Sequence, residues 1–419
     1  MSARTDRANA TNAMIASFLG WTMDAFDFFV LTLVLTDVAR DFHTDKAAVA
    51  LTLTASLVMR PVGALLFGVI ADRFGRRLPL MIDVVFYAIV EVFSGLAPSY
   101  KVFFGLRLLY GIGMGGEWGV GASLALESVP AKWRGLLSGL LQEGYAFGYL
   151  LAAIAYPVVY HFAPHLRWRA LFFLGGAPAL LALFVRSRVK ESAVWEKSRA
   201  PWSTYGRTVV RNWRRFLYLV ALMAMLNLMS HGTQDMFPTL LKTQRHLTQS
   251  QVSFVTVISM VGAILGGLVV GGLSNRWGRR RTMVAAALLG VLVVPAWAFS
   301  PRLAVIVAGA FALQFMVQGA WGVIPAHLNE LSPGALRGFF PGFAYQLGVL
   351  IAAGIPAVEA VLARHISYST AMGTLAVAIL LVGSVVIALG PEARGVSFDA
   401  PVPAAETADL VADPHRANG

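Results

Sequence analysis

Three charged residues interrupt the long apolar stretches of the first 70 positions: Asp24, Asp27 and Arg60. A charged side chain at the centre of a bilayer costs roughly 2.5–3.5 kcal/mol on insertion scales, so it persists where it faces a cavity or a partner. Arginine stays charged and presents a planar fork that matches a carboxylate. Arg60 therefore predicts an anchor for an anionic substrate. A structural ion pair with Asp24, Asp27 or Glu117 is the alternative.

The two aspartates are candidates for binding a proton. Asp24 and Asp27 are three residues apart and share one face of a helix. Burial disfavours the charged form of a carboxyl, so one of them could bind and release a transported proton. A structural hydrogen bond to a neighbouring helix is the alternative. Glu117, among glycines, is either a further proton site or a structural partner, and Arg107 serves either coupling or helix packing.

A polar stripe follows in the second half of the chain. Asn227, Ser230, His231 and Gln234 fall at positions i, i+3, i+4 and i+7, which is one face of a helix. Asp235 is four residues after His231 and adjacent to it on that surface. The imidazole titrates near neutral pH, which suits proton coupling, although a purely structural histidine is the alternative. A polar stripe at membrane depth would line a water-filled path.

Later segments supply candidates for the opposite wall of the same cavity. Gln314 and Gln318 are four residues apart in one apolar stretch, and Tyr345 and Gln346 lie in the next. We expect Gln318 and Tyr345 to contact substrate as neutral donors. Glu359 and Arg364, near the outer end of their stretch, are expected to form a surface pair.

The elements that must position these residues are helices in a membrane. The chain has 419 residues, of which 57% are hydrophobic and 13% charged, about half the charged share of a soluble protein. An open strand cannot satisfy its backbone in lipid, so each apolar stretch predicts a helix. The expected fold is an all-α membrane protein with twelve transmembrane helices, at 13–36, 48–71, 79–97, 101–126, 136–160, 167–187, 215–240, 249–273, 281–300, 303–327, 339–362 and 367–389.

The chain also repeats itself at an offset of 203 residues. Gly68-x-x-x-Asp72-Arg73-x-Gly75-Arg76-Arg77 returns as Gly271-x-x-x-Asn275-Arg276-x-Gly278-Arg279-Arg280, and Glu127-x-x-Pro130-x-x-x-Arg134-Gly135 returns as Glu330-x-x-Pro333-x-x-x-Arg337-Gly338. We expect a six-helix half at 1–187, a cytoplasmic linker at 188–214, a second six-helix half at 215–390 and a disordered tail at 391–419. Such repeats place a binding site at their interface.

The repeated loop motif resembles the signature of the major facilitator superfamily. The run Arg107-x-x-x-Gly111-x-Gly113-x-Gly115 resembles a second motif of that superfamily. The resemblance implies alternating access. It also implies gating ion pairs at the cytoplasmic face, for which Asp72, Arg73, Arg76, Arg134, Arg276 and Arg279 are the candidates. Asn275 stands where the first half has Asp72, so the lock in the second half is expected to be weaker or absent.

The segment Asn227-x-x-Ser-His-x-Thr-Gln-Asp resembles the lactate/pyruvate:proton symporter branch, which is related to the sialate:proton symporters. This resemblance implies symport of a small monocarboxylate anion with a proton, with Asn227, His231, Gln234 and Asp235 in binding or coupling. A larger acid, such as sialate, an aromatic acid or a dicarboxylate, is the alternative. A drug exporter or a sensor is less consistent with Arg60 and with the short tails.

Composition excludes several other functions. The net charge of +12 follows from basic loops, which predict that both termini are cytoplasmic in the cell membrane, and it does not indicate nucleic-acid binding. The chain has no cysteine, no phosphate-binding loop and no metal-ligand spacing. We therefore expect no enzyme, no metal and no cofactor. The expected partners are an organic anion, a proton and the lipid bilayer, and the functional unit is expected to be a monomer.

Overall fold

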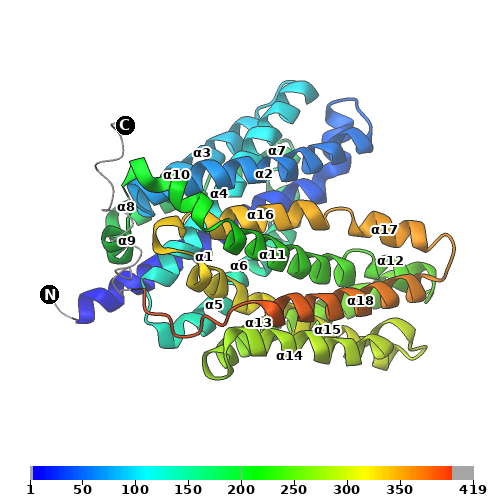
Figure 1. Ribbon diagram of the computed structural model, residues 1–419. Coiled ribbons are helices and arrows are strands. Elements are labelled where there is room, and N and C mark those ends of the chain that lie inside the picture. Colours follow the sequence, from blue (N-terminus) through cyan, green and yellow to red (C-terminus); the bar gives the residue numbers. More distant parts are fainter. Residues whose placement is uncertain (1–2, 200, 399–419) are drawn as a thin grey trace, which may run out of the picture.

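The structure is a computed structural model that describes residues 3–199 and 201–398. Every regular element within these residues is a helix (Figure 1). The N-terminal bundle comprises α1 to α8 and the C-terminal bundle comprises α11 to α18. The N-terminal elements are α1 (Ala3–Asp41), α2 (Lys46–Phe74), α3 (Arg77–Gly95), α4 (Tyr100–Glu127), η1 (Ala131–Trp133), α5 (Arg134–Gln142), α6 (Gly144–Phe162), α7 (Trp168–Leu174) and α8 (Pro178–Arg188).

The segment between the bundles contains two short helices, α9 (Ala193–Ser198) and α10 (Trp202–Arg211). The C-terminal elements are α11 (Trp213–Gln234), α12 (Phe237–Thr243), α13 (Gln249–Trp277), α14 (Arg279–Val294), η2 (Pro295–Phe299), α15 (Leu303–Leu331), η3 (Gly334–Leu336), α16 (Phe340–Ala352), α17 (Ile355–Leu362) and α18 (Tyr368–Leu389).

Eleven helical segments of the described chain are long and apolar enough to cross a membrane. The sequence predicts twelve, and the remaining one is α4, whose 28 residues would span a bilayer by length. Its glycines, together with Arg107 and Glu117, lower its hydropathy. Several spans are broken where proline or glycine interrupts the backbone hydrogen bonds, as between α11 and α12 before Pro238 and between α16 and α17 at Gly354.

Glycines let α2 and α4 pack with their backbones in contact. A β-carbon on Gly111 would lie 2.2 Å from the carbonyl oxygen of Ser56, and one on Gly115 would lie 1.9 Å from that of Arg60. In the reverse direction, a β-carbon on Gly63 would lie 1.7 Å from the carbonyl oxygen of Ile112. Small residues permit such close approach between membrane helices. The position of Arg60 is therefore set by the glycine motif of α4.

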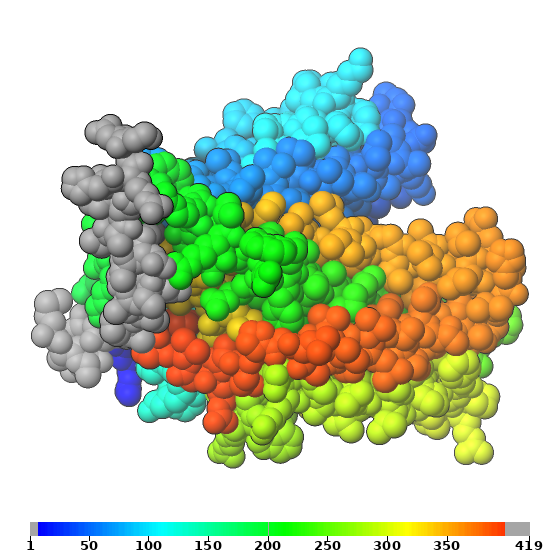
Figure 2. All heavy atoms as spheres, viewed as in Figure 1, coloured from blue at the N-terminus to red at the C-terminus, as the bar shows by residue number. Residues whose placement is uncertain are grey.

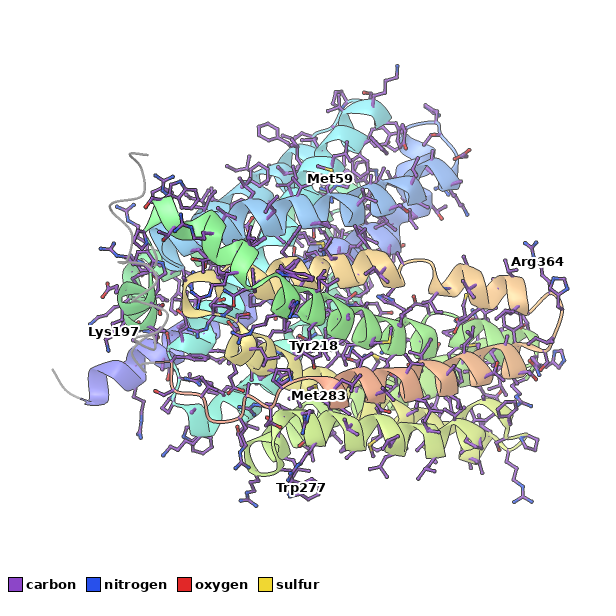
Figure 3. All side chains as sticks on the ribbon, viewed as in Figure 1. Met59, Lys197, Tyr218, Trp277, Met283 and Arg364 are labelled. Atoms are coloured by element: carbon purple, nitrogen blue, oxygen red, sulfur yellow. The ribbon has the colours of Figure 1, made fainter. Side chains whose placement is uncertain are left out.

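The two ends of the molecule differ. The helices α9 and α10 and the start of α1 lie at one end, which we call the linker end, and Lys197 and Arg364 mark the linker end and the far end respectively (Figure 3). The bundles are joined at the linker end by hydrogen bonds, including those from Ser123 Oγ to the Arg337 carbonyl (2.6 Å) and from the Ala326 amide to Ser138 Oγ (2.9 Å). At the far end the surface is hollowed between the start of α2 and α17 (Figure 2). The conformation is closed at the linker end and open at the far end.

Part of the tail that the sequence predicts to be disordered makes defined contacts. Residues 391–398 cross the linker end, where Glu392 Oε1 accepts hydrogen bonds from the Arg279 amide (3.0 Å) and Oε2 from the Arg280 amide (3.1 Å). The Phe398 ring is buried, with the guanidinium carbon of Arg134 3.4 Å and that of Arg337 3.9 Å from its centre. Hydrophobic burial and charge thus hold this segment. The rest of the predicted tail, 399–419, lies outside the described residues.

Candidate functional site

The centre of the molecule holds an aromatic cluster that joins the bundles. Trp21 and Trp118 come from α1 and α4, and Tyr345 comes from α16. The Tyr345 ring centre lies 4.6 Å from that of Trp118, 6.4 Å from that of Trp21 and 5.7 Å from that of Trp321. The Trp21 and Trp321 rings meet Tyr345 edge to face, which is a favourable geometry, and the Trp118 ring is tilted against it. The cluster forms a floor between the open far end and the closed linker end.

Arg60 lies beside this floor and has unused hydrogen-bonding capacity. Its side chain is 4% exposed, and its guanidinium carbon lies 5.8 Å from the centre of the Tyr345 ring. The Nε and Nη2 atoms have no hydrogen-bond partner within the described residues, and neither does Trp21 Nε1. A buried donor without a partner is costly. These unpaired donors fit the predicted anion anchor better than a closed structural ion pair.

The C-terminal wall is a hydrogen-bonded amide network. Gln234 Nε2 donates to Gln314 Oε1 (2.7 Å), and Gln318 Nε2 donates to Ser230 Oγ (2.9 Å). Gln314 Nε2 in turn donates to Thr233 Oγ1 (3.1 Å). The structure therefore brings together Gln234 and Gln318, two of the predicted substrate contacts. Asn227 is buried, and its Nδ2 donates to the Met223 carbonyl of its own helix (2.8 Å).

The predicted pair of His231 and Asp235 is present and accessible. The His231 Nδ1 atom lies 3.0 Å from Asp235 Oδ2, and both side chains are more than one third exposed. Glu359 lies on the same side of the C-terminal bundle, 3.7 Å from where a Gly232 β-carbon would be. Glu359 is fully buried and neither of its oxygens has a partner within the described chain. The expected surface pair with Arg364 is therefore wrong, because α17 turns Glu359 inward.

The N-terminal bundle contains more buried acids than the sequence analysis selected. Asp24 and Glu117 are buried as expected, and none of their four carboxylate oxygens has a partner within the described chain. Asp83 on α3 is buried in the same way. Glu91 on α3 pairs with Arg107 at 2.8 Å. The signal that identifies Asp24, an acid within an apolar stretch, is equally present at Asp83 and Glu91.

Asp27 lies beside Glu91, one turn after Asp24 on α1. Its side chain is buried, and its Oδ1 is 2.5 Å from the place where a Gly175 β-carbon would be. A β-carbon at the same glycine would also lie 3.1 Å from Glu91 Cβ, so Asp27 and Glu91 face one another beside Gly175. Arg107, through its ion pair with Glu91, therefore lies next to Asp27.

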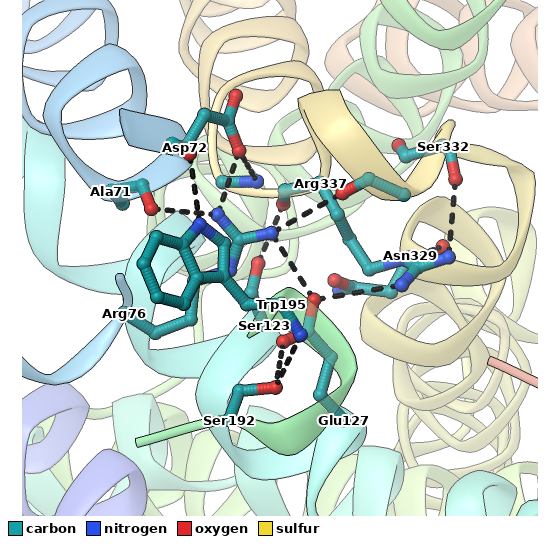
Figure 4. A network of polar contacts seen from close by, with 12 residues as sticks. Ala71, Asp72, Arg76, Ser123, Glu127, Ser192, Trp195, Asn329, Ser332 and Arg337 are labelled. Carbon is teal, nitrogen blue, oxygen red and sulfur yellow. Dashed lines mark hydrogen bonds and ion pairs between the residues drawn. The ribbon is translucent and has the colours of Figure 1, made fainter. Parts of the chain in front are cut away.

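Two of the predicted gating residues, Asp72 and Arg76, lie in the main junction at the linker end (Figure 4). Asp72 accepts hydrogen bonds from the Gly338 amide (2.7 Å) and the Phe339 amide (3.2 Å), directly before α16, and from Arg76 (2.7 Å). Tyr205 on α10 also donates to Asp72 (3.0 Å), and burial together with this carboxylate raises the pKa of its hydroxyl. Asp72 thus ties the N-terminal bundle to the positive end of α16.

Arg76 is the centre of this junction within the N-terminal bundle. It is fully buried and also contacts Glu127 (3.2 Å). Burial alone would lower its pKa, but the carboxylates of Glu127 and Asp72 raise it above the usual value. Arg73, by contrast, lies on the surface over the Trp202 ring, 4.6 Å from its centre, and makes no part of the buried junction.

The repeated junction of the C-terminal bundle is also present. The Gly135 amide donates to Asn275 Oδ1 (3.0 Å), which also accepts from Arg279 (3.0 Å), and Arg279 pairs with Glu330 at 2.9 Å. Asn275 therefore makes an interbundle bond, although the sequence predicts a weak or absent lock. It supplies one neutral acceptor where Asp72 supplies two charged oxygens. Arg276 is exposed, and its carbonyl accepts from Arg394.

Known families match both parts of the chain. Residues 12–215 match the family described as "Sugar (and other) transporter", and residues 220–411 match the family described as "Major Facilitator Superfamily". The solved structure of the proton:xylose symporter XylE has the same fold, with a TM-score of 0.74 at 18% identity over 94% of this chain and 98% of that chain.

Relatives of the chain are transporters. It is 31% identical to a probable 4-methylmuconolactone transporter of Cupriavidus pinatubonensis, over 92% of this chain and 91% of the relative. A carboxylic acid transporter protein homolog of Saccharomyces cerevisiae is 30% identical, over 84% of this chain and 61% of that relative. The sialic acid transporter NanX of Escherichia coli is 24% identical, over 88% and 93% respectively.

The chain belongs to the major facilitator superfamily. It is an integral, multi-pass membrane transporter with an all-helical fold, and it is not an enzyme. The resemblance of the loop motifs to this superfamily is thereby confirmed. The sialate relationship has a counterpart among the relatives, whereas the lactate and pyruvate branch rests on the sequence pattern of α11 alone.

Proposed function

We propose that the protein is a proton-coupled symporter of organic-acid anions. The observation that carries this proposal is Arg60, a buried guanidinium with unpaired Nε and Nη2 atoms beside the aromatic floor. A carboxylate that enters from the open far end would complete these hydrogen bonds and neutralise the charge. The relatives named for methylmuconolactone, carboxylic acid and sialic acid support an acid as substrate.

Coupling between anion binding and proton binding would follow from the cost of an unpaired charge in the protein interior. Asp24 lies within electrostatic range of Arg60 and has no hydrogen-bond partner for either oxygen within the described chain. A substrate carboxylate on Arg60 would remove the countercharge of Asp24, which would then gain stability by taking up a proton. Anion and proton therefore bind together. The exposed pair of His231 and Asp235 would deliver protons at the far end.

The transport cycle would alternate around this site. The floor of Trp21, Trp118 and Tyr345 separates the substrate from the linker end. Breaking the Asp72 and Asn275 bonds would open that end while the far end closes. We propose that the linker end and both termini are cytoplasmic in the cell membrane, that residues 1–187 and 215–390 move as two halves, and that one chain is the functional unit.

Two substrate classes are supported by different observations. The resemblance of the Asn227-x-x-Ser-His-x-Thr-Gln-Asp segment to the lactate/pyruvate:proton symporter branch favours small monocarboxylates. The names of the relatives favour larger acids, and the cis,cis-muconate transport protein of Acinetobacter baylyi, 26% identical, adds to them. Both classes share the carboxylate that Arg60 would bind.

The test is uptake of labelled acids into proteoliposomes with and without an inward proton gradient. The panel contains L-lactate, pyruvate, cis,cis-muconate and sialic acid, with xylose as a neutral control. The proposal expects gradient-driven uptake of at least one acid and no uptake of xylose. Uptake of a larger acid without lactate or pyruvate would reject the monocarboxylate assignment, and uptake of xylose alone would reject an anion carrier.

A further inference from the structure

The membrane-depth core of the N-terminal bundle holds more acid than base. Away from the linker-end junction, helices α1 to α4 bury five acids, which are Asp24, Asp27, Asp83, Glu91 and Glu117, and two arginines, Arg60 and Arg107. Full ionisation would leave three uncompensated negative charges in a dry interior, where each isolated charge is strongly disfavoured. The core must therefore hold protons.

Both buried arginines already have an acid as neighbour. Arg107 pairs with Glu91 at 2.8 Å and donates to Ser94 Oγ (2.6 Å). Arg60 lies within range of Asp24. Within the described chain, Asp83 and Glu117 make no ion pair, and none of their four carboxylate oxygens has a hydrogen-bond partner. These two carboxyls therefore have no countercharge, and the stable state for such groups is neutral.

Asp83 and Glu117 form one cluster with Asp24. Glu117 Oε1 lies 2.3 Å from where a β-carbon of Gly20 would be, one helical turn before Asp24 on the same face of α1. Asp83 lies within electrostatic range of both Glu117 and Asp24. The four oxygens of Asp83 and Glu117 have no partner within the described chain. Two neighbouring acids without donors can satisfy one another only if at least one carries a proton.

A tyrosine hydroxyl points to the same conclusion independently. Tyr87, one turn after Asp83 on α3, is fully buried, and its hydroxyl has no partner within the described residues. It lies within range of Asp83, Glu117, Asp24 and Asp27. Tyr87 packs closely against α4, since a β-carbon on Gly113 would lie 2.7 Å from Tyr87 Cβ. A hydroxyl that both donates and accepts can pass a proton between carboxyls.

The cluster extends from Asp24 toward the linker end. Asp83 is six residues from the start of α3, and Glu117 is ten residues from the end of α4, which places them about 9 Å and about 15 Å along those helices from the linker end. Asp27 lies on the opposite side of Asp24, one turn closer to the far end. The acids therefore follow one another along the bundle, and Asp83 lies nearest to the linker end, which is the end that would open next in the transport cycle.

We propose that Asp83 and Glu117, with the Tyr87 hydroxyl, form a second exchangeable proton-binding site behind Asp24. The site holds a proton that is additional to the one bound by Asp24 or Asp27, and it releases that proton when the linker end opens. The role in transport rests on the proposed symport of acid and proton, whereas proton binding by the pair does not.

Infrared spectroscopy tests the binding site without any substrate. Protonated carboxyls have a carbonyl stretch separate from the amide bands, and its amplitude is followed in reconstituted protein from acid to alkaline pH, in water and in deuterated water. Asp83→Asn and Glu117→Gln should each reduce the band, and the lost component should titrate and shift on deuteration. Glu392→Gln is the matched control, because backbone hydrogen bonds keep the Glu392 carboxylate ionised except in acid; at neutral and alkaline pH it should leave the band unchanged.

A band unchanged in both variants, or a lost component that neither titrates nor exchanges, would overturn the proposal. Transport is then measured as protons taken up per labelled acid in proteoliposomes. Asp83→Asn should transport the acid with one proton fewer than the wild type. An equal ratio in both would remove the pair from the cycle. Absence of acid uptake by the wild type would reject the symporter assignment, while the infrared result would still decide the proton site.

Discussion

Replacing Asp72 by asparagine should open the linker end far more often than the matched change at Asn275. In the described conformation, Asp72 accepts two interbundle bonds from the Gly338 and Phe339 amides at 2.7 and 3.2 Å. The bond with Arg76 lies within the N-terminal bundle, so it persists in both conformations and cancels. The Tyr205 bond comes from α10, between the bundles, so the two amide bonds are the ones that join Asp72 to the C-terminal bundle and that opening would break.

The size of the effect follows from hydrogen-bond energies. Two bonds to a charged acceptor, at about 1.5–3 kcal/mol each, would be replaced by one neutral bond of about 0.5–1.5 kcal/mol. The closed linker end would lose about 2–5 kcal/mol, which raises the ratio of open to closed molecules about 30-fold to several thousand-fold. Asn275→Ala removes a single neutral bond and should raise that ratio only about 2- to 12-fold.

Distance measurement between spin labels provides the assay. The chain has no native cysteine, so labels at Lys132→Cys and Arg281→Cys report on the two bundles without background. Asp72→Asn should shift the distribution toward longer distances, and Asn275→Asp should shift it in the opposite direction. Equal effects of Asp72→Asn and Asn275→Ala, or an unchanged distribution in Asp72→Asn, would refute the assignment of Asp72 as the stronger lock.

Three further predictions concern packing, the tail and pH. Gly115→Ala should lower both the thermal midpoint of unfolding and the affinity for the anion. Its β-carbon would overlap the Arg60 carbonyl, at a cost of about 1–3 kcal/mol. Gly105→Ala is the control and should change neither, because a β-carbon there would have no atom within 4 Å. Phe398→Ala should destabilise the closed linker end by about 1–2 kcal/mol, because two cation–π contacts are lost; the same spin labels measure this. Phe398→Leu should have the same effect as Phe398→Ala, because leucine keeps an apolar side chain but has no π face. Glu392 is partly buried, but hydrogen bonds from three backbone amides outweigh burial and hold its pKa below the usual range. The stabilisation of the tail by Glu392 is present above the unfolded pKa of roughly 4.3 and is lost as pH falls through the lower folded pKa. A dye at Val396→Cys should therefore report release of the tail only in acid. In Glu392→Gln the same dye should report release already at neutral pH.

Much of the architecture could be predicted from periodicity and repeats. The apolar stretches locate the helices because lipid forces each one to satisfy its own backbone, and the 203-residue offset pairs Asp72 with Asn275. The hydropathy pattern does not show where a span breaks. The gap between α16 and α17 lies at Gly354, just before Pro356 in the first turn of α17, and the course of α17 after it places Glu359 in the interior.

The candidate site was predictable by residue type rather than by partner. An arginine or acid within an apolar stretch is visible in the sequence, as for Arg60 and Asp24. Which groups remain unpaired depends on rotamers and helix contacts, so Asn227 turns to its own backbone while Gln314 joins the wall. The same holds for residues 391–398. The Pro- and Ala-rich composition of the tail that they begin predicts disorder, although contacts with Arg279 and Arg134 order them.

The central claim is that a buried, unpaired Arg60 binds the carboxylate of a substrate that moves with a proton. Its most direct test is proton-gradient-driven uptake, in proteoliposomes, of the acid that the wild type carries, compared with Arg60→Gln and Arg60→Lys. Losing a charge-assisted pair of bonds costs about 3 kcal/mol or more, or at least about 100-fold in affinity. Arg60→Gln should lose uptake while remaining folded, and Arg60→Lys should retain a part. Uptake by Arg60→Gln at the wild-type affinity and rate would contradict the account.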